Sequence, residues 1–455
     1  MAIKTQTLRR LLIVGIVVAG GFSIYLHFRL AEKREAAAEA AANRPETRFN
    51  EALQAADRAA INRDPAAGWT ALVAAQAAAD EALAEHPNDP RLLRARLIVA
   101  RRLGQVAELR NRSADARAHL TDAVKRSEAL FATDPTDERN RADRLNAARE
   151  LSALLLKIPA VDEAARVSTD AAEAVEQSAA TVPPLAPVRM LLGEVWLDAA
   201  RAFAEAKDAP RTIECARKAL VHAEAGRGPE EDPLTATSRA STVSATAVEL
   251  AEKVGDAAAA EAFERDAVRL LEARQRLEPD DIAVRRTLAA RLVRLADHAQ
   301  AAGRFDEAEA LHARSVEVRR ALHIQYPADA DALRDLVRGL NHQGAFFSDR
   351  DRDAEALTAY AEAAALAGGL EGDDRRSALV TIGNHAQLLG RRDRIPEARA
   401  EAERALALAT TLAAETPADE RAVLDLANAE LRLARLLRSV PQPDYRRARE
   451  VAQSG

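Results

Sequence analysis

The sequence predicts an all-α protein, a right-handed α-solenoid of about eight helix-turn-helix repeats that follows one N-terminal transmembrane helix. Proline recurs every 48 residues along most of the chain, and such a fixed period indicates a stacked helical array. Hydrophobic residues make up 48% of the chain and aromatic residues only 3%, and the apolar residues are mostly Ala and Leu, which favour helix. No long stretch alternates β-branched residues, so no sheet is predicted. The prolines of the period are Pro87, Pro135, Pro183, Pro279 and Pro327, and the missing member falls within the turn-rich residues 226–233.

Each unit is predicted to hold two amphipathic helices joined by a short turn. A proline ends the second helix, because it lacks a backbone donor and clashes with the preceding turn. An acid two residues later can cap the next first helix, as at Asp89, where Pro90 takes the first helical position. Polar turns are predicted between the two helices of a unit at 157–163, 251–256 and 301–306.

Small residues stand at two fixed places on the predicted second helices. The two places are seven residues apart, so they lie two turns apart on one helical face. We expect the small residues to let the neighbouring helix approach closely. Nineteen positions before the proline these are Gly68, Ala116, Ala164, Thr212, Ala260, Ala308 and, for Pro417, Ala398. Twelve positions before it they include Ala123, Ala171, Ala219, Ala267, Ser315 and Ala405.

Two units depart from the period. The unit at 328–375 has no proline at its end, and a turn at 368–374 takes its place. At the C-terminus, Tyr445 and Ala448 look like the start of a further second helix, which could be either a solenoid cap or a frayed tail.

Residues 295–316 resemble a tetratricopeptide repeat (TPR), through Leu295, Ala296, Ala299, Gly303, Phe305, Ala308 and the later Pro327. Residues 382–406 with Pro417 are similar, with a longer turn, whereas matches in 46–260 are weaker. The unit exceeds the 34-residue period of that family, so the chain resembles a bacterial long-helix variant. The resemblance implies an α-solenoid that binds protein partners in a groove lined mainly by first helices.

The N-terminal region carries an apolar run at 11–28, near the lower limit for spanning a bilayer. We expect an uncleaved transmembrane anchor, with a cleaved signal peptide or a buried soluble helix as the alternatives. Lys and Arg are equally frequent on its two sides, so their distribution hardly decides the orientation of the anchor. We expect the N-terminus inside the cytoplasm and the solenoid outside it. The predicted domains are a basic segment (1–10), the anchor in an inner (cell) membrane (11–28), a helical linker (29–45) and the solenoid (46–455).

Composition excludes some classes of function. The formal net charge is −6; residues 1–34 hold six Lys and Arg and one acid, so the remainder carries 59 Lys and Arg against 70 Asp and Glu. This mildly acidic body argues against nucleic-acid binding. The chain has one cysteine, Cys215, and can therefore form neither an intrachain disulfide nor a cysteine-based metal knuckle. We expect Cys215 to be a buried small residue, not a nucleophile.

No sequence motif of catalysis or cofactor binding is present, so we predict no catalytic, cofactor-binding or metal-binding residues, no cofactor and no enzyme activity. His298 and His312 fall on adjacent predicted helices, where a metal-binding pair is conceivable but surface or groove-lining histidines are expected. The acid pairs at 280–281 and 373–374 are expected to cap helices. The arginine pairs at 391–392 and 446–447 are expected on solvated faces.

The large aromatic residues are expected to pack between helices, with peptide anchoring as the alternative. They are Trp69, Trp196, Phe346, Phe347 and Tyr360.

The leading functional hypothesis is a membrane-anchored scaffold for protein–protein interaction, serving assembly or regulation of an envelope complex. Three alternatives remain open: a non-enzymatic partner of a bacterial signalling kinase, a small-ligand binder or enzyme that uses the groove, and a self-associating structural protein. The partner itself is not identified by the sequence.

Overall fold

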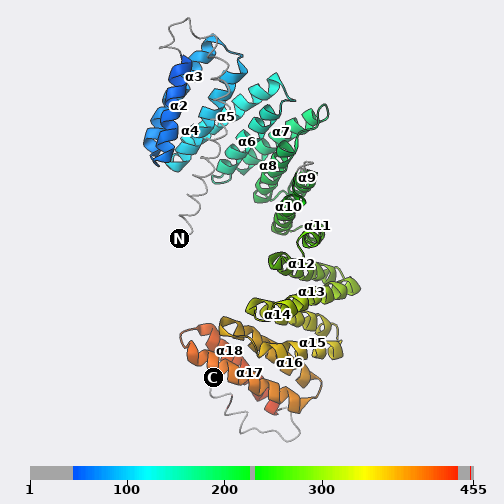
Figure 1. Ribbon diagram of the computed structural model, residues 1–455. Helices are drawn as coiled ribbons and strands as arrows, with labels where there is room; N and C mark the ends of the chain where they lie inside the picture. The colour runs from blue at the N-terminus through cyan, green and yellow to red at the C-terminus, as the bar shows by residue number, and fades with distance from the viewer. Residues whose placement is uncertain (1–44, 226–230, 439–450, 452–455) are drawn as a thin grey trace. The chain divides into compact units, whose positions relative to one another are not determined.

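The computed structural model describes residues 45–225, 231–438 and 451 of the chain (Figure 1). This part contains 17 α-helices and no strand, which confirms the all-α prediction for the residues described. The first eight helices are α2 (Pro45–Ile61), α3 (Pro65–Glu85), α4 (Pro90–Leu109), α5 (Ser113–Thr133), α6 (Glu138–Leu155), α7 (Val161–Ala179), α8 (Ala186–Glu205) and α9 (Ala209–Ala225). The remainder are α10 (Pro233–Lys253), α11 (Ala257–Leu277), α12 (Ile282–Ala301), α13 (Phe305–Gln325), α14 (Ala330–Ser348), α15 (Asp353–Ala367), the short 3₁₀ helix η1 (Gly372–Asp374), α16 (Arg375–Arg391), α17 (Ile395–Glu415) and α18 (Glu420–Arg438).

The helices alternate between a first and a second member of a hairpin, as predicted. The starts of the second helices α3, α5, α7, α9, α11, α13 and α15 follow one another at 48-residue intervals, and α17 begins 42 residues after α15. The predicted turns at 251–256, 301–306 and 368–374 include the residues between consecutive helices, and the turn at 157–163 includes all of these but Leu156.

The chain forms two compact units. Of the described residues, 45–225, 231 and 249–256 belong to the first unit, and 232–248, 257–438 and 451 belong to the second. Within each unit the two helices of a hairpin pack on one another, and each hairpin packs on the next (Figure 1). First helices also contact the first helix of the following hairpin, as α6 does with α8 and α14 with α16.

Acidic residues cap several first helices as predicted. The carboxylates of Asp89, Asp137 and Asp281 accept backbone N–H groups of the first turn at 2.8–3.1 Å. Such a cap satisfies donors that have no partner within the helix. Asp374 is the exception: its carboxylate caps no backbone group, and it pairs with Arg334 at 3.3 Å.

Most of the described turns inside the hairpins contain a left-handed residue; the turn between α6 and α7 does not. Gly255 and Gly303 adopt φ of 77° and 75°, and non-glycine residues take the same conformation elsewhere. A left-handed residue just after a helix allows its N–H to bond back to the last turn. Non-glycine residues accept this conformation at a cost, which the packing of the hairpin must offset. These non-glycine residues are Arg63, Asn111, Lys207, Asp351 and Asp393.

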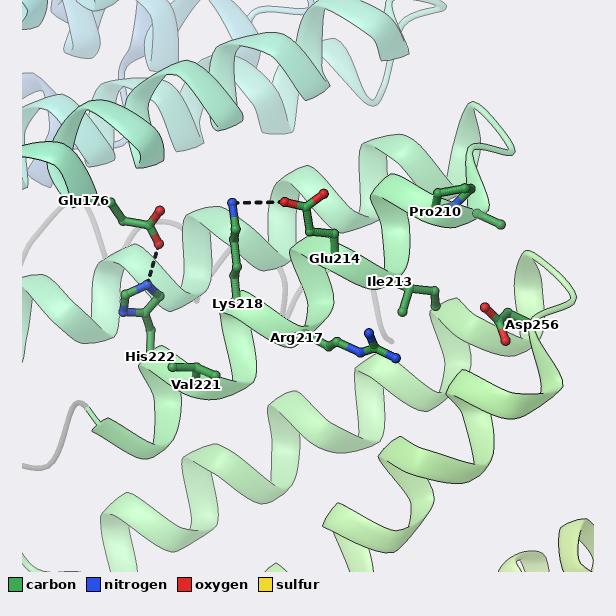
Figure 2. Close-up of a pocket in the computed structure, with 10 residues that line it drawn as sticks. Glu176, Pro210, Ile213, Glu214, Arg217, Lys218, Val221, His222 and Asp256 are labelled. Atoms are coloured by element: carbon green, nitrogen blue, oxygen red, sulfur yellow. Dashed lines mark hydrogen bonds and ion pairs between the residues drawn. The ribbon is translucent and has the colours of Figure 1, made fainter.

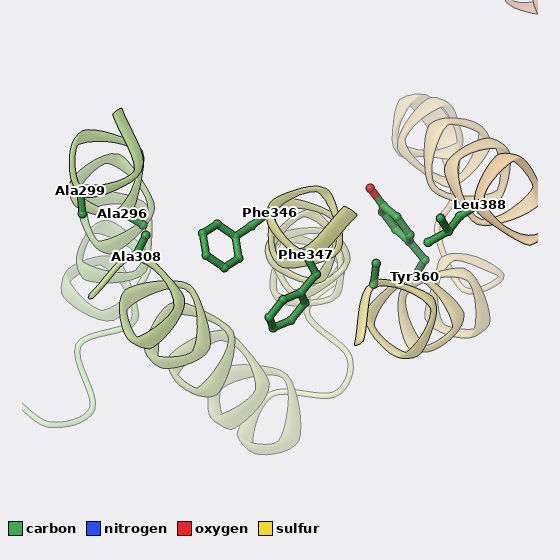
Figure 3. Packing of buried hydrophobic residues seen from close by; sticks show 8 residues of the cluster. Ala296, Ala299, Ala308, Phe346, Phe347, Tyr360 and Leu388 are labelled. Carbon is green, nitrogen blue, oxygen red and sulfur yellow. The ribbon is translucent and has the colours of Figure 1, made fainter. Parts of the chain in front are cut away.

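The small residues of the second helices lie at the helix contacts. Ala116, Ala164, Ala260, Ala308 and Ala398 each have 0% of their surface exposed, which confirms the predicted close approach. Large side chains fill the space that remains, as in the cluster that Figure 3 shows. There Phe346 extends from α14 toward the alanines of α12 and α13, and Tyr360 of α15 extends toward Leu388 of α16.

Arginines on first helices join one hairpin to the next. Arg94 of α4 donates to Asp143 of α6 at 2.8 Å, and Arg286 of α12 donates to Asp335 of α14 at 2.8 Å. Arg376 of α16 repeats this geometry on α18. In each pair the acid stands 49 positions after the arginine, which is one 48-residue unit plus one residue. Because the side chains are only partly buried, each pair contributes on the order of 1 kcal/mol or less, and the apolar contacts carry most of the stability.

The predicted localisation in a membrane is corrected by the structure. Among residues 45–225 and 231–438, no helix is long and apolar enough to cross a bilayer. The physical reason is that these helices bury one stripe and carry charged residues on the rest of their surface. The predicted anchor at 11–28, with the flanking segments 1–10 and 29–44, lies outside the described residues.

Replacing Ala308 with Leu tests the close helix approach. Ala308 is fully buried between α12 and α13, so the larger side chain should destabilise the protein by about 1–3 kcal/mol through overpacking. The control is Ala310→Leu on the same helix, at an exposed position, which should change stability by less than about 0.5 kcal/mol. Thermal unfolding followed by circular dichroism measures both, and equal effects of the two substitutions would contradict the prediction.

Candidate functional site

The first unit has an open pocket of about 750 Å³ along α9 (Figure 2). The first residues of α9 form one end of the pocket, and residues near the last turn of α9 form the other end. Glu176 of α7 and Asp256, which follows α10, contribute from neighbouring elements. The lining residues are Glu176, Ala209, Pro210, Ile213, Glu214, Arg217, Lys218, Val221, His222 and Asp256.

Glu176 is the centre of the polar network at this pocket. Its Oε1 accepts a hydrogen bond from Trp196 Nε1 of α8 at 2.8 Å. The same oxygen lies 2.7 Å from His222 Nε2 of α9. One carboxylate oxygen thus connects three consecutive helices.

Lys218 links this network to the exposed face of α9. Its ammonium lies 4.0 Å from the centre of the Trp196 ring, within the range of a cation–π interaction. It also pairs with Glu214 at 3.3 Å, one turn earlier on the same helix, as the dashed line in Figure 2 shows. Arg217 beside it is exposed at the edge of the pocket.

The pocket combines ionised groups with an apolar wall. Burial acts to raise the pKa of Glu176, but the hydrogen bonds from His222 and Trp196 outweigh it and hold the pKa below the usual value of 4.5. The carboxylate is therefore ionised at neutral pH. Ile213 is buried and Val221 is 63% exposed, so an apolar surface lies next to these charges.

Such an arrangement is suited to recognition of a polar and apolar group together. It offers donors from Arg217 and Lys218, acceptors from the carboxylates, and an apolar contact at Val221. The pocket lies on a second helix, whereas the sequence predicted a groove lined mainly by first helices.

Cys215 lies on the opposite, inner side of α9. Only 4% of its surface is exposed, and burial raises the pKa of its thiol to about 12. The thiol is therefore protonated at neutral pH, as expected for a buried small residue.

His298 and His312, the two conceivable metal ligands, differ in their burial. His312 is buried and its ring packs at a tilt against that of Phe346, with ring centres 5.1 Å apart, while His298 is half-buried. Burial, with the nearby His342 and Arg319, lowers the pKa of His312 to about 4, so its ring is neutral. Across residues 45–225 and 231–438, no group of three or more His, Cys, Asp or Glu side chains could hold a metal ion.

Four of the five large aromatic residues are buried in the helix contacts, as predicted. Trp69 is the exception, since it is only half-buried and packs edge-on against His119 at 5.4 Å. Arg112 lies 4.8 Å from the centre of its ring.

The arginine pair at 391–392 is exposed, as predicted, and it also contacts an acid. Both side chains pair with Asp353, an acid that is only 6% exposed, so they hold a buried carboxylate as well as facing solvent. The pair at 446–447 lies outside the described residues.

Sequence reasoning missed Glu176 and His222. A signal was available, because the two residues are 46 positions apart, close to one period, and this separation places them on consecutive second helices. Nothing in the sequence, however, distinguished this acid from the many others on the second helices.

The fold and the site define a helical-hairpin repeat protein with an open surface pocket. No protein-family model matches the chain, and neither does any curated protein sequence.

Similar solved structures include several repeat proteins. A signal-transduction ATPase with a tetratricopeptide-repeat sensor from Pyrococcus horikoshii is 11% identical over 80% of this chain and 52% of its own, with a TM-score of 0.40. The apo form of RapI is 9% identical over 90% of this chain and 98% of its own, with a TM-score of 0.36. The nearly identical TPR-like repeats of a putative kinesin light chain from Podosopora anserina are 15% identical over 51% and 98%, with a TM-score of 0.33. These values are too low to say what this chain binds.

Replacing Glu176 with Ala tests the polar network. The change leaves Trp196 Nε1 and His222 without their acceptor, which should cost about 1–3 kcal/mol at neutral pH. Because the folded-state pKa of Glu176 is depressed, its contribution is present above the ordinary value of 4.5 and is lost as the pH falls through the folded value. The difference between wild type and variant should therefore shrink in acid. Glu173→Ala, at an exposed position of α7, is the control, and unfolding curves from pH 7 to pH 3 measure both.

The burial of Cys215 predicts slow thiol labelling. In the native protein a thiol-reactive dye should modify it far more slowly than in denaturant, because the thiol is protonated and covered. Since the chain has one cysteine, the label reports this site alone. Equal labelling rates in native and denatured protein would show that α9 does not pack as described.

Proposed function

We propose that this protein is a TPR-like scaffold for protein–protein interaction, and that the α9 pocket is a contact site for a segment of a partner protein. The observation that carries the proposal is the exposed apolar contact at Val221 beside the ionised groups of Arg217, Lys218 and Glu214. A contact surface with an apolar centre and a polar surround is the usual composition of a protein interface.

The geometry favours a partner segment with mixed chemistry. An apolar side chain of the partner would rest on Ile213 and Val221, and its polar groups would reach Arg217 on one side and His222 on the other. Lys218 and Glu176 are already engaged with Trp196 and His222, so they would shape the wall rather than supply the main contacts.

Assembly or regulation of a multi-protein complex, or partnership with a signalling kinase, is compatible with this surface. An envelope location is not part of the proposal, since the localisation was corrected. A bacterial long-helix variant of the repeat and a single right-handed solenoid over 46–455 remain predictions.

A small-ligand site is the second candidate function. The pocket volume of about 750 Å³ lies within the range of small-molecule sites, roughly 300–1,000 Å³. Against it, the pocket is open along α9 and its apolar wall is narrow, whereas small-ligand sites usually enclose most of their ligand.

Photo-crosslinking in cells tests the scaffold proposal. A photoreactive residue in place of Val221 should give a discrete crosslinked band, because this side chain is 63% exposed at the pocket. Arg217→Glu in the same protein should weaken that band several-fold by reversing a charge at the contact. The measurement is the band intensity relative to protein amount.

The matched control places the photoreactive residue at Thr411, an exposed position of α17 in the second unit. A partner specific for the pocket should crosslink at Val221 and not at Thr411. Equal bands at both positions, or no band at either, would contradict the proposal. A thermal shift caused by a metabolite, reversed by Arg217→Glu and without a crosslinked protein, would support the small-ligand candidate in its place.

A further inference from the structure

The last described first helix, α18, exposes large apolar side chains on one face. Leu424 is 59% exposed and Leu431 is 45% exposed. On its other side α18 contacts α16 and α17, and buries Leu433 and Leu437 in the core. Val451 packs against that same core cluster.

The position of these leucines in the repeat identifies the face. Asp335 of α14 and Asp425 of α18 each accept from the arginine 49 positions earlier, on the preceding first helix, so they are equivalent. By the same register Leu424 corresponds to Arg334, and Leu431 corresponds to Asn341.

Both α14 residues reach forward to the next hairpin. Arg334 pairs with Asp374 at 3.3 Å, just before α16 begins, and Asn341 donates to Thr381 of α16. The exposed leucines of α18 therefore occupy the face that an inner hairpin covers with the following first helix. Leu424 and Leu431 stand where α14 has two polar residues, so this surface of α18 is suited to contact with an apolar helix and not with water.

The stripe is complementary to itself. Glu420, Leu424, Ala427, Leu431 and Arg435 recur at three- or four-residue spacing and share one side of the helix. If a second α18 runs antiparallel, with a twofold axis between residues 427 and 428, Leu424 meets the partner's Leu431. The same axis places Glu420 opposite Arg435 of the partner subunit, at both ends of the contact. Glu420 and Arg435 are both exposed, so their charges are available.

We propose that this stripe is a homodimer interface, in which α18 packs antiparallel on α18 of a second copy. An interface of this kind uses the same patch on both subunits, which a twofold axis requires. A single helix pair buries less area than a standard interface, so the dimer is weak, with a Kd on the order of 10 µM. The proposal is independent of the α9 pocket, which lies in the other unit.

Sedimentation velocity of the full chain at about 1–100 µM tests the dimer through charge reversal. Glu420→Arg places two arginines opposite each other, and Arg435→Glu places two glutamates opposite each other. Each single variant should therefore raise the dimer Kd at least about tenfold, since like charges meet at two symmetric places. The double variant restores opposite charges and should return the Kd to within about threefold of wild type.

Matched controls separate the interface from general effects. Arg276→Glu makes the same charge change at an exposed position of α11 and should leave the Kd unchanged. Circular dichroism of each variant shows whether the helices are intact. In a second measurement, Asn428→Cys should form an intermolecular disulfide under mild oxidation, because the axis places residues 427 and 428 side by side. Thr411→Cys on α17 should not.

Three results would overturn the proposal. The first is a protein that stays monomeric over the whole concentration range, which would indicate that residues 439–455 of the same chain cover the leucines. The second is a dimer that does not respond to either single variant, which would place the interface on another surface. The third is a double variant that is no tighter than the singles.

Discussion

The structure depends on the close approach of helices through small residues on the second helix of each hairpin. Thr212, Ala219 and their equivalents are fully buried at these contacts, and the space they leave allows two helix backbones to pack closely. A larger side chain at one such position would separate two helices and disturb the contacts on both sides of them. An array built in this way needs few aromatic residues, which accounts for the 3% aromatic content.

Charged residues also join the hairpins where one hairpin meets the next. Arg94, Arg286 and Arg376 each reach an acid on the following first helix, and the separation is 49 residues in all three pairs. A pair that recurs with the period fixes the register of neighbouring hairpins, although its contribution to stability is small. At the equivalent position of α18 stands Leu424 in place of an arginine, so this helix presents an apolar face to its neighbour.

The α9 pocket shows how a repeat array acquires a specific site. Glu176, Trp196 and His222 come from three successive helices, and only the stacking of hairpins brings them within hydrogen-bonding distance. The site requires no unusual backbone, because the regular array holds its residues in place. Trp196 and His222 differ from the residues 48 positions away in the neighbouring repeats, whereas glutamate also stands 48 positions from Glu176 on either side.

The sequence by itself determined the helical hairpins, their turns and the buried small residues. It could do so because prolines, capping acids and alanines act locally or recur with the period, as Asp281, Gly303 and Ala308 show. It did not determine the pocket, the pairing of Arg392 with Asp353, or the exposed face of α18, and its membrane localisation was wrong. Those features depend on which side chains of separate helices meet, and a one-dimensional pattern does not distinguish one surface acid from another. The tertiary structure decided them, because the packing of one hairpin on the next sets which charges are paired and which apolar side chains remain exposed.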